Sequence, residues 1–366
     1  MATIEVRCTI KLPDPVVLAC QKDTSYPPIQ WQLANGDTVS IEMEVPEDQI
    51  KSQYRMHSSK GNWFVNSKVR AVALSLVLHN VSNDDVERLH ARHATAKTLR
   101  ARFKTDSGPL DLDYQEAPEL GQRIVCEIVE SINLVLRFIR DNYGQHWLSL
   151  ISADEEKPQN FLNEVRAEWR EAANPWQQLL LKPPIVAIGP VYVGAWNRYL
   201  ETSDWKAIQQ MITRNEGPPD AFTLLSDSRD RYGQGDKQIA IVHLNSALEW
   251  AVQLFLRRQL ASKIPADSLE GLLKQSHGRL LEAWVLPLDR SLGLGLELNE
   301  WKSIKKIQGL RKEAGHPTLL NEIAKLTRTD FQILVRDAAS AVAKLSGLTM
   351  PKMPPLMDAD VAGGTI

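Results

Sequence analysis

The spacing of apolar residues changes part-way along this 366-residue chain, and that change limits the folds open to it. Up to about residue 115, apolar and polar positions alternate, as they do at Ile4, Val6, Cys8 and Ile10. A period of two is typical of a strand with one buried face. Beyond residue 216, apolar residues instead recur every three or four positions, as in an amphipathic helix. The sequence therefore predicts an α+β multidomain protein in which strands and helices occupy different parts of the chain.

Four regions follow from this pattern. They are a β-rich sandwich or barrel-like domain (1–115), a mixed α/β connector region (116–215), an all-α helical bundle (216–348) and a disordered tail (349–366). We expect the β-rich domain to act as a sensor or to select the target. The role of the connector region stays open at this level.

Two local predictions can be compared directly with a structure. Asn35-Gly36 lies between two alternating runs, and this pair tolerates the positive φ angles of a tight hairpin turn, so a β-hairpin is expected there. The segment Glu164–Leu181 is predicted to be a helix interrupted near Asn174-Pro175.

The composition is that of an ordinary globular protein. The formal net charge is −2 and hydrophobic residues make up 43% of the chain, so any basic surface for nucleic acid must be local. The cysteines Cys8, Cys20 and Cys126 are far apart and odd in number, which argues against a disulfide framework and against a cysteine zinc site. We therefore expect a cytoplasmic protein with no cofactor and no metal. We see no signal peptide and no apolar run approaching a membrane span, so no membrane association is expected.

The segment Leu298–Leu320 carries the candidate functional residues. Ile304, Ile307 and Leu310 lie on one helical face, and Arg311 falls on that same buried-leaning face. A charged residue there is costly unless it is paired. Gly315 marks the helix end, and His316 follows where the chain leaves the helix.

A plain interpretation of this pair stands beside the functional one. Arg311 can be an ordinary buried ion-pair partner, and His316 a surface loop residue. The lysines around them supply local positive charge whichever interpretation holds. They are Lys302, Lys305, Lys306 and Lys312.

The order of elements in residues 219–347 resembles the HEPN superfamily, named for higher eukaryote and prokaryote nucleotide binding. The resemblance rests on a long helix containing Ala247-Leu248-Glu249, a penultimate helix ending in Arg311-x4-His316, and a final amphipathic helix. It covers about the last third of the chain.

The resemblance implies a metal-independent endoribonuclease acting as a homodimer through the C-terminal helical domain. Arg311 would bind the scissile phosphate, His316 would transfer protons, and Glu249 would orient Arg311. Lys302, Lys305 and Lys306 would bind RNA, with Lys312 in support. One departure is Lys312 itself, because a small polar residue such as Asn or Asp often follows the arginine in this family.

The implied role is a toxin or an anti-phage defence effector that leaves 2′,3′-cyclic phosphate ends on RNA. The alternative is a non-catalytic HEPN-like dimerisation or nucleotide-binding scaffold, in which Glu249 is an ordinary helix-surface acid. A third interpretation makes the N-terminal domain a carbohydrate- or peptide-binding sandwich and the helical domain an oligomerisation module. A regulatory protein or ligand at the N-terminal domain is compatible with the endoribonuclease interpretation.

Overall fold

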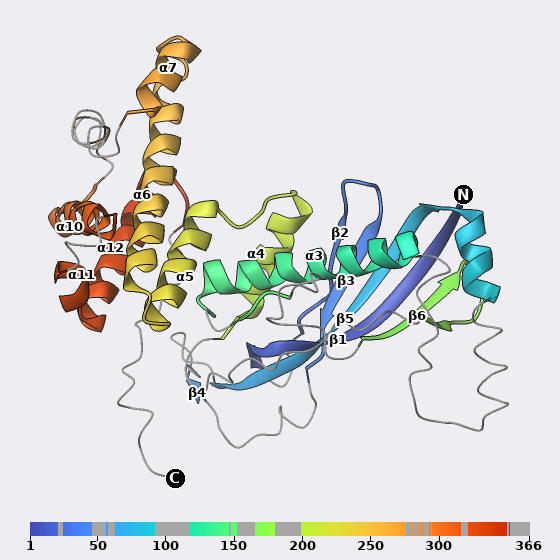
Figure 1. Ribbon diagram of the computed structural model, residues 1–366. Coiled ribbons are helices and arrows are strands. Elements are labelled where there is room, and N and C mark those ends of the chain that lie inside the picture. Colours follow the sequence, from blue (N-terminus) through green and yellow to red (C-terminus); the bar gives the residue numbers. More distant parts are fainter. Residues whose placement is uncertain are drawn as a thin grey trace. The chain divides into compact units, whose positions relative to one another are not determined.

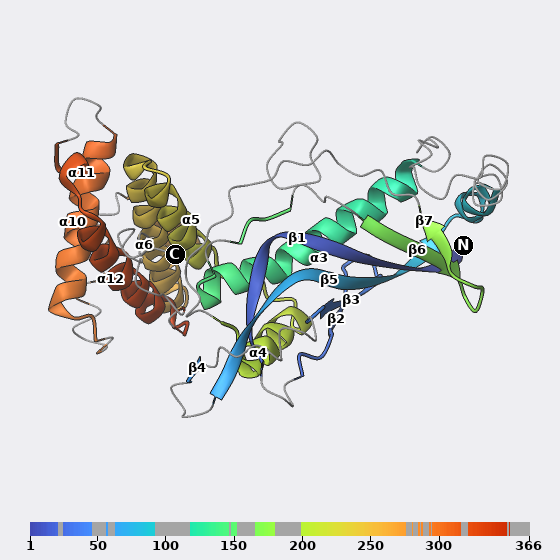
Figure 2. The same cartoon turned by 90° about the horizontal axis from the view of Figure 1, so that it is seen from below.

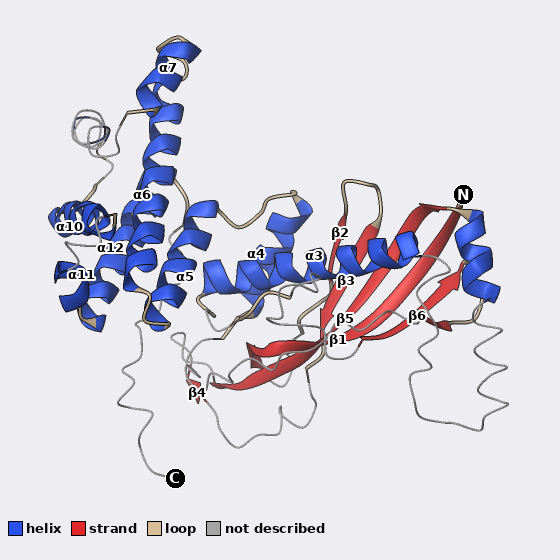
Figure 3. Ribbon diagram, in the orientation of Figure 1, coloured by secondary structure: helices blue, strands red, loops and turns tan. Residues whose placement is uncertain are grey.

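The computed structural model describes residues 1–20, 25–45, 56–57, 63–91, 118–145, 148–151, 165–179, 199–275, 280, 285, 287, 293, 295–315, 321–349 and 351. The chain forms two compact units. Unit 1 comprises Met1–Leu136 and Trp147–Gly217, and unit 2 comprises Arg137–His146 and Pro218–Ile366. The described strands all belong to unit 1, whereas unit 2 is helical (Figure 3). The α+β class expected from the sequence is confirmed.

Unit 1 is built on one antiparallel sheet in the order β2-β3-β5-β1-β6-β7, with β4 paired to β5 (Figure 1). The strands are β1 (Ala2–Cys20), β2 (Ile29–Gln32), β3 (Thr38–Met43), β4 (Met56–His57), β5 (Trp63–Val81), β6 (Val165–Glu171) and β7 (Gln177–Leu179). Within the described residues the sheet is open, with β2 and β7 at its edges, and these residues do not close into a barrel; the sandwich or barrel-like domain stays a prediction.

The long strand β1 changes character at a register shift between Lys11 and Val16. Before the shift, Ile4, Val6, Cys8 and Ile10 are buried while the residues that alternate with them are not, so one face is covered. Pro15, which has no N–H to donate, lies at the shift. After it, every residue of 16–20 is buried, so the strand is covered on both faces.

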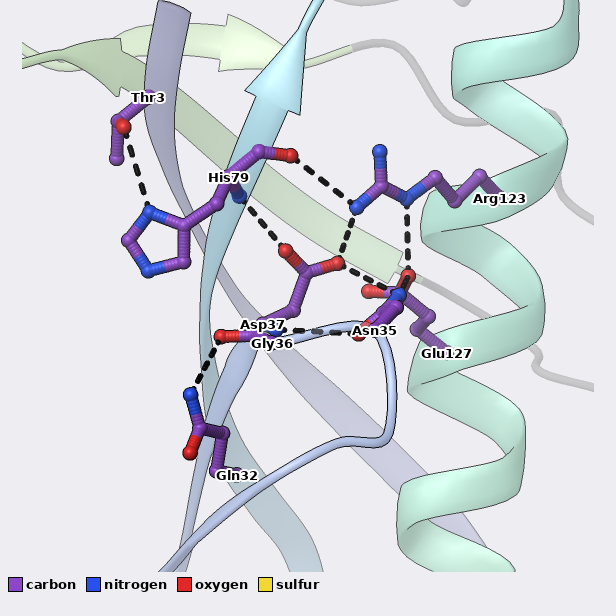
Figure 4. A network of polar contacts seen from close by, with 8 residues as sticks. All are labelled: Thr3, Gln32, Asn35, Gly36, Asp37, His79, Arg123 and Glu127. Carbon is purple, nitrogen blue, oxygen red and sulfur yellow. Dashed lines mark hydrogen bonds and ion pairs between the residues drawn. The ribbon is translucent and has the colours of Figure 1, made fainter.

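The predicted hairpin is confirmed as β2 and β3, and its turn is fixed by a buried polar network (Figure 4). Gly36 has φ +90°, which the turn requires. The fully buried Asp37 accepts hydrogen bonds from the backbone N–H of His79 (2.7 Å), from the Asn35 amide (2.9 Å) and from Arg123. Because Arg123 lies on a helix, this network ties the turn to the helix beside the sheet.

That helix is α3 (Pro118–Tyr143), which lies along the sheet over its unit 1 portion (Figure 2). On it, Glu127 accepts from Arg123 (3.0 Å) and from Asn35 (2.9 Å). Burial is the main cause that raises the pKa of Glu127, and the nearby Asp37 charge acts in the same direction.

Unit 2 is a helical bundle around one apolar core. Its helices are α5 (Asp220–Gly233), α6 (Lys237–Leu260), α7 (Ala266–Leu273), α10 (Leu298–Ala314), α11 (Asn321–Lys325) and α12 (Arg328–Ser346). The central helix α6 packs against α5, α10 and α12. Tyr232 stacks on Phe331 with ring centroids 4.0 Å apart, which joins α5 to α12. Thr327 and Asp330 form a capping box at the start of α12.

Helix α6 is an exception to the expectation that no apolar run approaches the length of a membrane span. By length and composition it is apolar enough to cross a membrane, although most of that stretch is buried inside unit 2. A buried core helix passes the same test, and α6 is apolar on two sides because neighbours surround it.

The predicted tail over 349–366 lies outside the described residues except at residues 349 and 351. The helix predicted over Glu164–Leu181 is wrong, since β6 and β7 occupy it.

Candidate nucleic-acid interface

Helix α10 carries most of the predicted site residues, and its two ends are well defined. At its start, Glu297 and Glu300 form a capping box. Glu300 is buried, and Lys344 of α12 donates to its carboxylate at 2.8 Å. At its end, Gly315 occupies the C-cap as expected, with φ −80°. The helix is therefore held by capping at its first turn and by an ion pair to α12.

Arg311 is exposed, which corrects the expectation that it lies on the buried face. Ile307 and Leu310 are buried and Ala314 packs against the core, but the side chain of Arg311, in the last turn, is exposed. Its Nη1 lies 3.5 Å from where a Cβ on Gly315 would sit, so the side chain lies beside the helix end. Within the described part of the chain its guanidinium has no ion-pair partner.

His316 lies outside the described residues, so the structure assigns no geometry to the Arg311–His316 pair. In sequence it follows Gly315 directly.

The four lysines predicted to surround the site are all exposed on α10. They are Lys302, Lys305, Lys306 and Lys312. Lys306 also acts on the start of α12: the pKa of Asp330 is lowered first by its hydrogen bond from Thr327 and further by the charge of Lys306. The lysines and Arg311 give α10 a basic exposed surface in a chain of net charge −2.

Glu249 is partly exposed on α6 and accepts a hydrogen bond from the buried Asn245 at 2.9 Å. Among the described residues no hydrogen bond or ion pair joins Glu249 to Arg311. Its role in orienting Arg311 therefore stays a prediction.

A second charged cluster in unit 2 escaped the sequence-based prediction. Arg140, near the end of α3, contacts Asp141 at 2.8 Å and Asp227 of α5 at 3.2 Å. Thr223 donates to Asp141 at 2.8 Å, and Nδ1 of His243 lies 3.9 Å from Asp227. The only sequence signal is the three-residue spacing of Asp227 and Asp230, which places both on one helical face.

This charged cluster holds a proton near neutral pH. Burial raises the pKa of Asp230 to about 7, and the charges of Asp227 and Asp141 add to the rise while Arg140 and Arg229 oppose it. Burial also raises the pKa of Asp227 and lowers that of Arg229 to about 10. The cluster can take up or release a proton, but it does not resemble a metal site. Within the described residues no set of His, Cys, Asp or Glu could hold a metal ion.

Comparison with known proteins adds no assignment. No family model matches the chain, and neither a curated protein nor a solved structure matches it.

Proposed function

We propose that this protein is a metal-independent endoribonuclease of HEPN type, with unit 2 as the RNA-binding and RNA-cleaving part. The observation that carries the proposal is the exposed guanidinium of Arg311, which lies without an ion-pair partner in the described structure at the end of a helix that exposes four lysines. A guanidinium binds a phosphate through two parallel hydrogen bonds and stays charged at any physiological pH. The lysines supply the attraction to RNA that the whole chain lacks.

RNA brings its own nucleophile to this reaction. The 2′-oxygen attacks the adjacent phosphorus, a base takes the 2′-hydroxyl proton, and the bond from phosphorus to the 5′-oxygen breaks as that oxygen gains a proton. The products are a 2′,3′-cyclic phosphate and a 5′-hydroxyl. His316 is the proposed proton carrier, since an imidazole titrates near neutral pH. Arg311 is the proposed ligand of the phosphate.

The resemblance further leads us to propose a homodimer through unit 2, in the cytoplasm, acting as a toxin or anti-phage defence effector. One observation supports dimerisation: Ile239 of α6 is an apolar residue that is 40% exposed. Light scattering of the purified chain tests it.

The decisive experiment is cleavage of mixed cellular RNA in EDTA by the wild type, Arg311→Ala and His316→Ala, with end-group analysis. Arg231→Ala is the matched control, because it removes an exposed guanidinium from the same unit. We expect cyclic-phosphate ends from the wild type and the control, and none from the two site variants. RNA that is bound but never cut by any variant supports the scaffold alternative, and equal cleavage by all four proteins refutes the assigned site.

A further inference from the structure

Gly309 lies in the middle of the exposed basic face of α10. Gly309 is exposed. Lys305 lies four residues before it, Lys306 lies three residues before it, and Lys312 lies three residues after it. Residues at these spacings are neighbours on a helix surface, with Cβ atoms about 5–6 Å apart. Gly309 is therefore a bare stretch of backbone bordered by three ammonium groups and, four residues after it, by Glu313.

Folding gives no reason for a glycine at this position. Its φ is not positive, so an L-residue fits the backbone. A Cβ added there would meet nothing within 4 Å, so packing does not exclude a larger side chain. Glycine inside a helix is less stable than alanine, because it loses more backbone entropy on folding. The chain thus keeps a destabilising residue where alanine would fit.

We infer that Gly309 is a contact point for the sugar–phosphate backbone of RNA, which lies across α10 and brings one stretch of phosphodiester within reach of Lys305, Lys306 and Lys312. The inference rests on the proposed function and adds a binding residue to it. A side chain at position 309 would hold the RNA farther from the helix, so that the three ammonium groups could no longer contact the same stretch of phosphodiester. Two acidic groups interact at or beside this face: Glu313, four residues after Gly309, accepts from the backbone N–H of Glu322 at 3.2 Å, and Asp330 interacts electrostatically with Lys306.

The charge pattern favours RNA over an acidic protein. Between Lys302 and Lys312 the exposed residues are the lysines, Gly309 and Arg311, with no exposed large apolar side chain, whereas Leu298, one turn before Lys302, is 70% exposed. Protein interfaces depend on buried apolar or aromatic anchors at their centre, whereas phosphate binding needs only positive charge and close approach.

The test compares Gly309→Ala with Gly271→Ala. Gly271 is also an exposed helical glycine with nothing within 4 Å of an added Cβ, but it lies on α7, four residues after Asp267. Binding is measured with fluorescent 2′-O-methyl RNA, which cannot be cleaved through its 2′-oxygen. Both variants should unfold at the wild-type temperature or roughly 2–4 °C higher, because alanine favours the helix.

Only Gly309→Ala should weaken binding, by about tenfold, which is the loss expected when one charge-assisted contact cannot form. Wild-type affinity in a stable Gly309→Ala protein overturns the inference while leaving the proposed function in place. A wild type that binds no RNA overturns both. Tighter binding of polyglutamate than of the RNA would make the partner an acidic polypeptide and refute the assignment to nucleic acid.

Discussion

Asp230 offers the sharpest test of the electrostatics of unit 2. Its pKa rises from 3.8 to about 7 in the folded chain, with burial as the main cause. The groups that act on it come from α3 and from its own helix α5: Arg140 and Asp141 from the first, Asp227 and Arg229 from the second. His243 of α6 faces the same cluster through Asp227.

The sign of the effect follows from linkage. A folded-state pKa above the unfolded value means that the folded chain binds the proton more tightly. The stability that this provides is fully present below pH 3.8 and is lost as pH rises through about 7. A rise of this size corresponds to about 4 kcal/mol, from about 1.36 kcal/mol for each pH unit. Relaxation of the neighbouring charges lowers it, so we expect a measured effect of about 2–4 kcal/mol.

Asp230→Asn removes the titration while keeping the shape of the side chain. Relative to the wild type, the variant should gain about 2–4 kcal/mol of stability between pH 4 and pH 8. Urea unfolding of the full chain, read by hydrogen–deuterium exchange in α5 and α6 peptides, measures it. Asp220→Asn is the control, because Asp220 is exposed at the start of the same helix. A gain below about 1 kcal/mol, or one matched by the control, would refute the reasoning.

Three further outcomes follow from the structure. Glu127→Gln should stabilise unit 1 increasingly as pH rises, because burial raises the pKa of Glu127 and the neutral amide of glutamine does not ionise. Urea unfolding over a series of pH values measures this, and destabilisation at every pH would contradict it. Thr327→Ala should cost about 1 kcal/mol by removing the N-cap of α12, with the exposed Thr329→Ala as control in thermal unfolding. A disulfide reagent at pH 8 should label the partly exposed Cys126 first, because burial raises the pKa of the Cys8 thiol to about 12; equal labelling rates for the two thiols would argue against this.

Much of unit 2 and part of the candidate site could be predicted from the sequence. Helices α5, α6, α10 and α12 follow three-four spacing, so each has a local signal in its own residues. The hairpin at Asn35-Gly36 and the lysines of α10 could likewise be predicted from short stretches of sequence. Helix capping and turn formation depend on residues only a few positions apart, so they can be predicted from the sequence.

Contacts between distant residues decided the rest. Strand β6 was expected to be helical, yet it pairs with β1, where Arg7 donates to Glu168 at 2.7 Å and Arg170 to Glu5 at 2.8 Å. Its residues have ordinary helix propensity, and only the partner strand supplies the hydrogen bonds that favour the extended form. Tertiary context thus overrode local preference.

The same division applies to the charged groups. The sequence alone identified Arg311 and its lysines, but only the tertiary structure shows that Arg311 is exposed although it directly follows the buried Leu310. The proton-binding cluster needs Arg140 and Asp227, which are far apart in sequence and 3.2 Å apart in space. Local spacing determines which face of a helix a residue occupies, whereas burial and pKa depend on what packs against that face, and only the tertiary structure determines that.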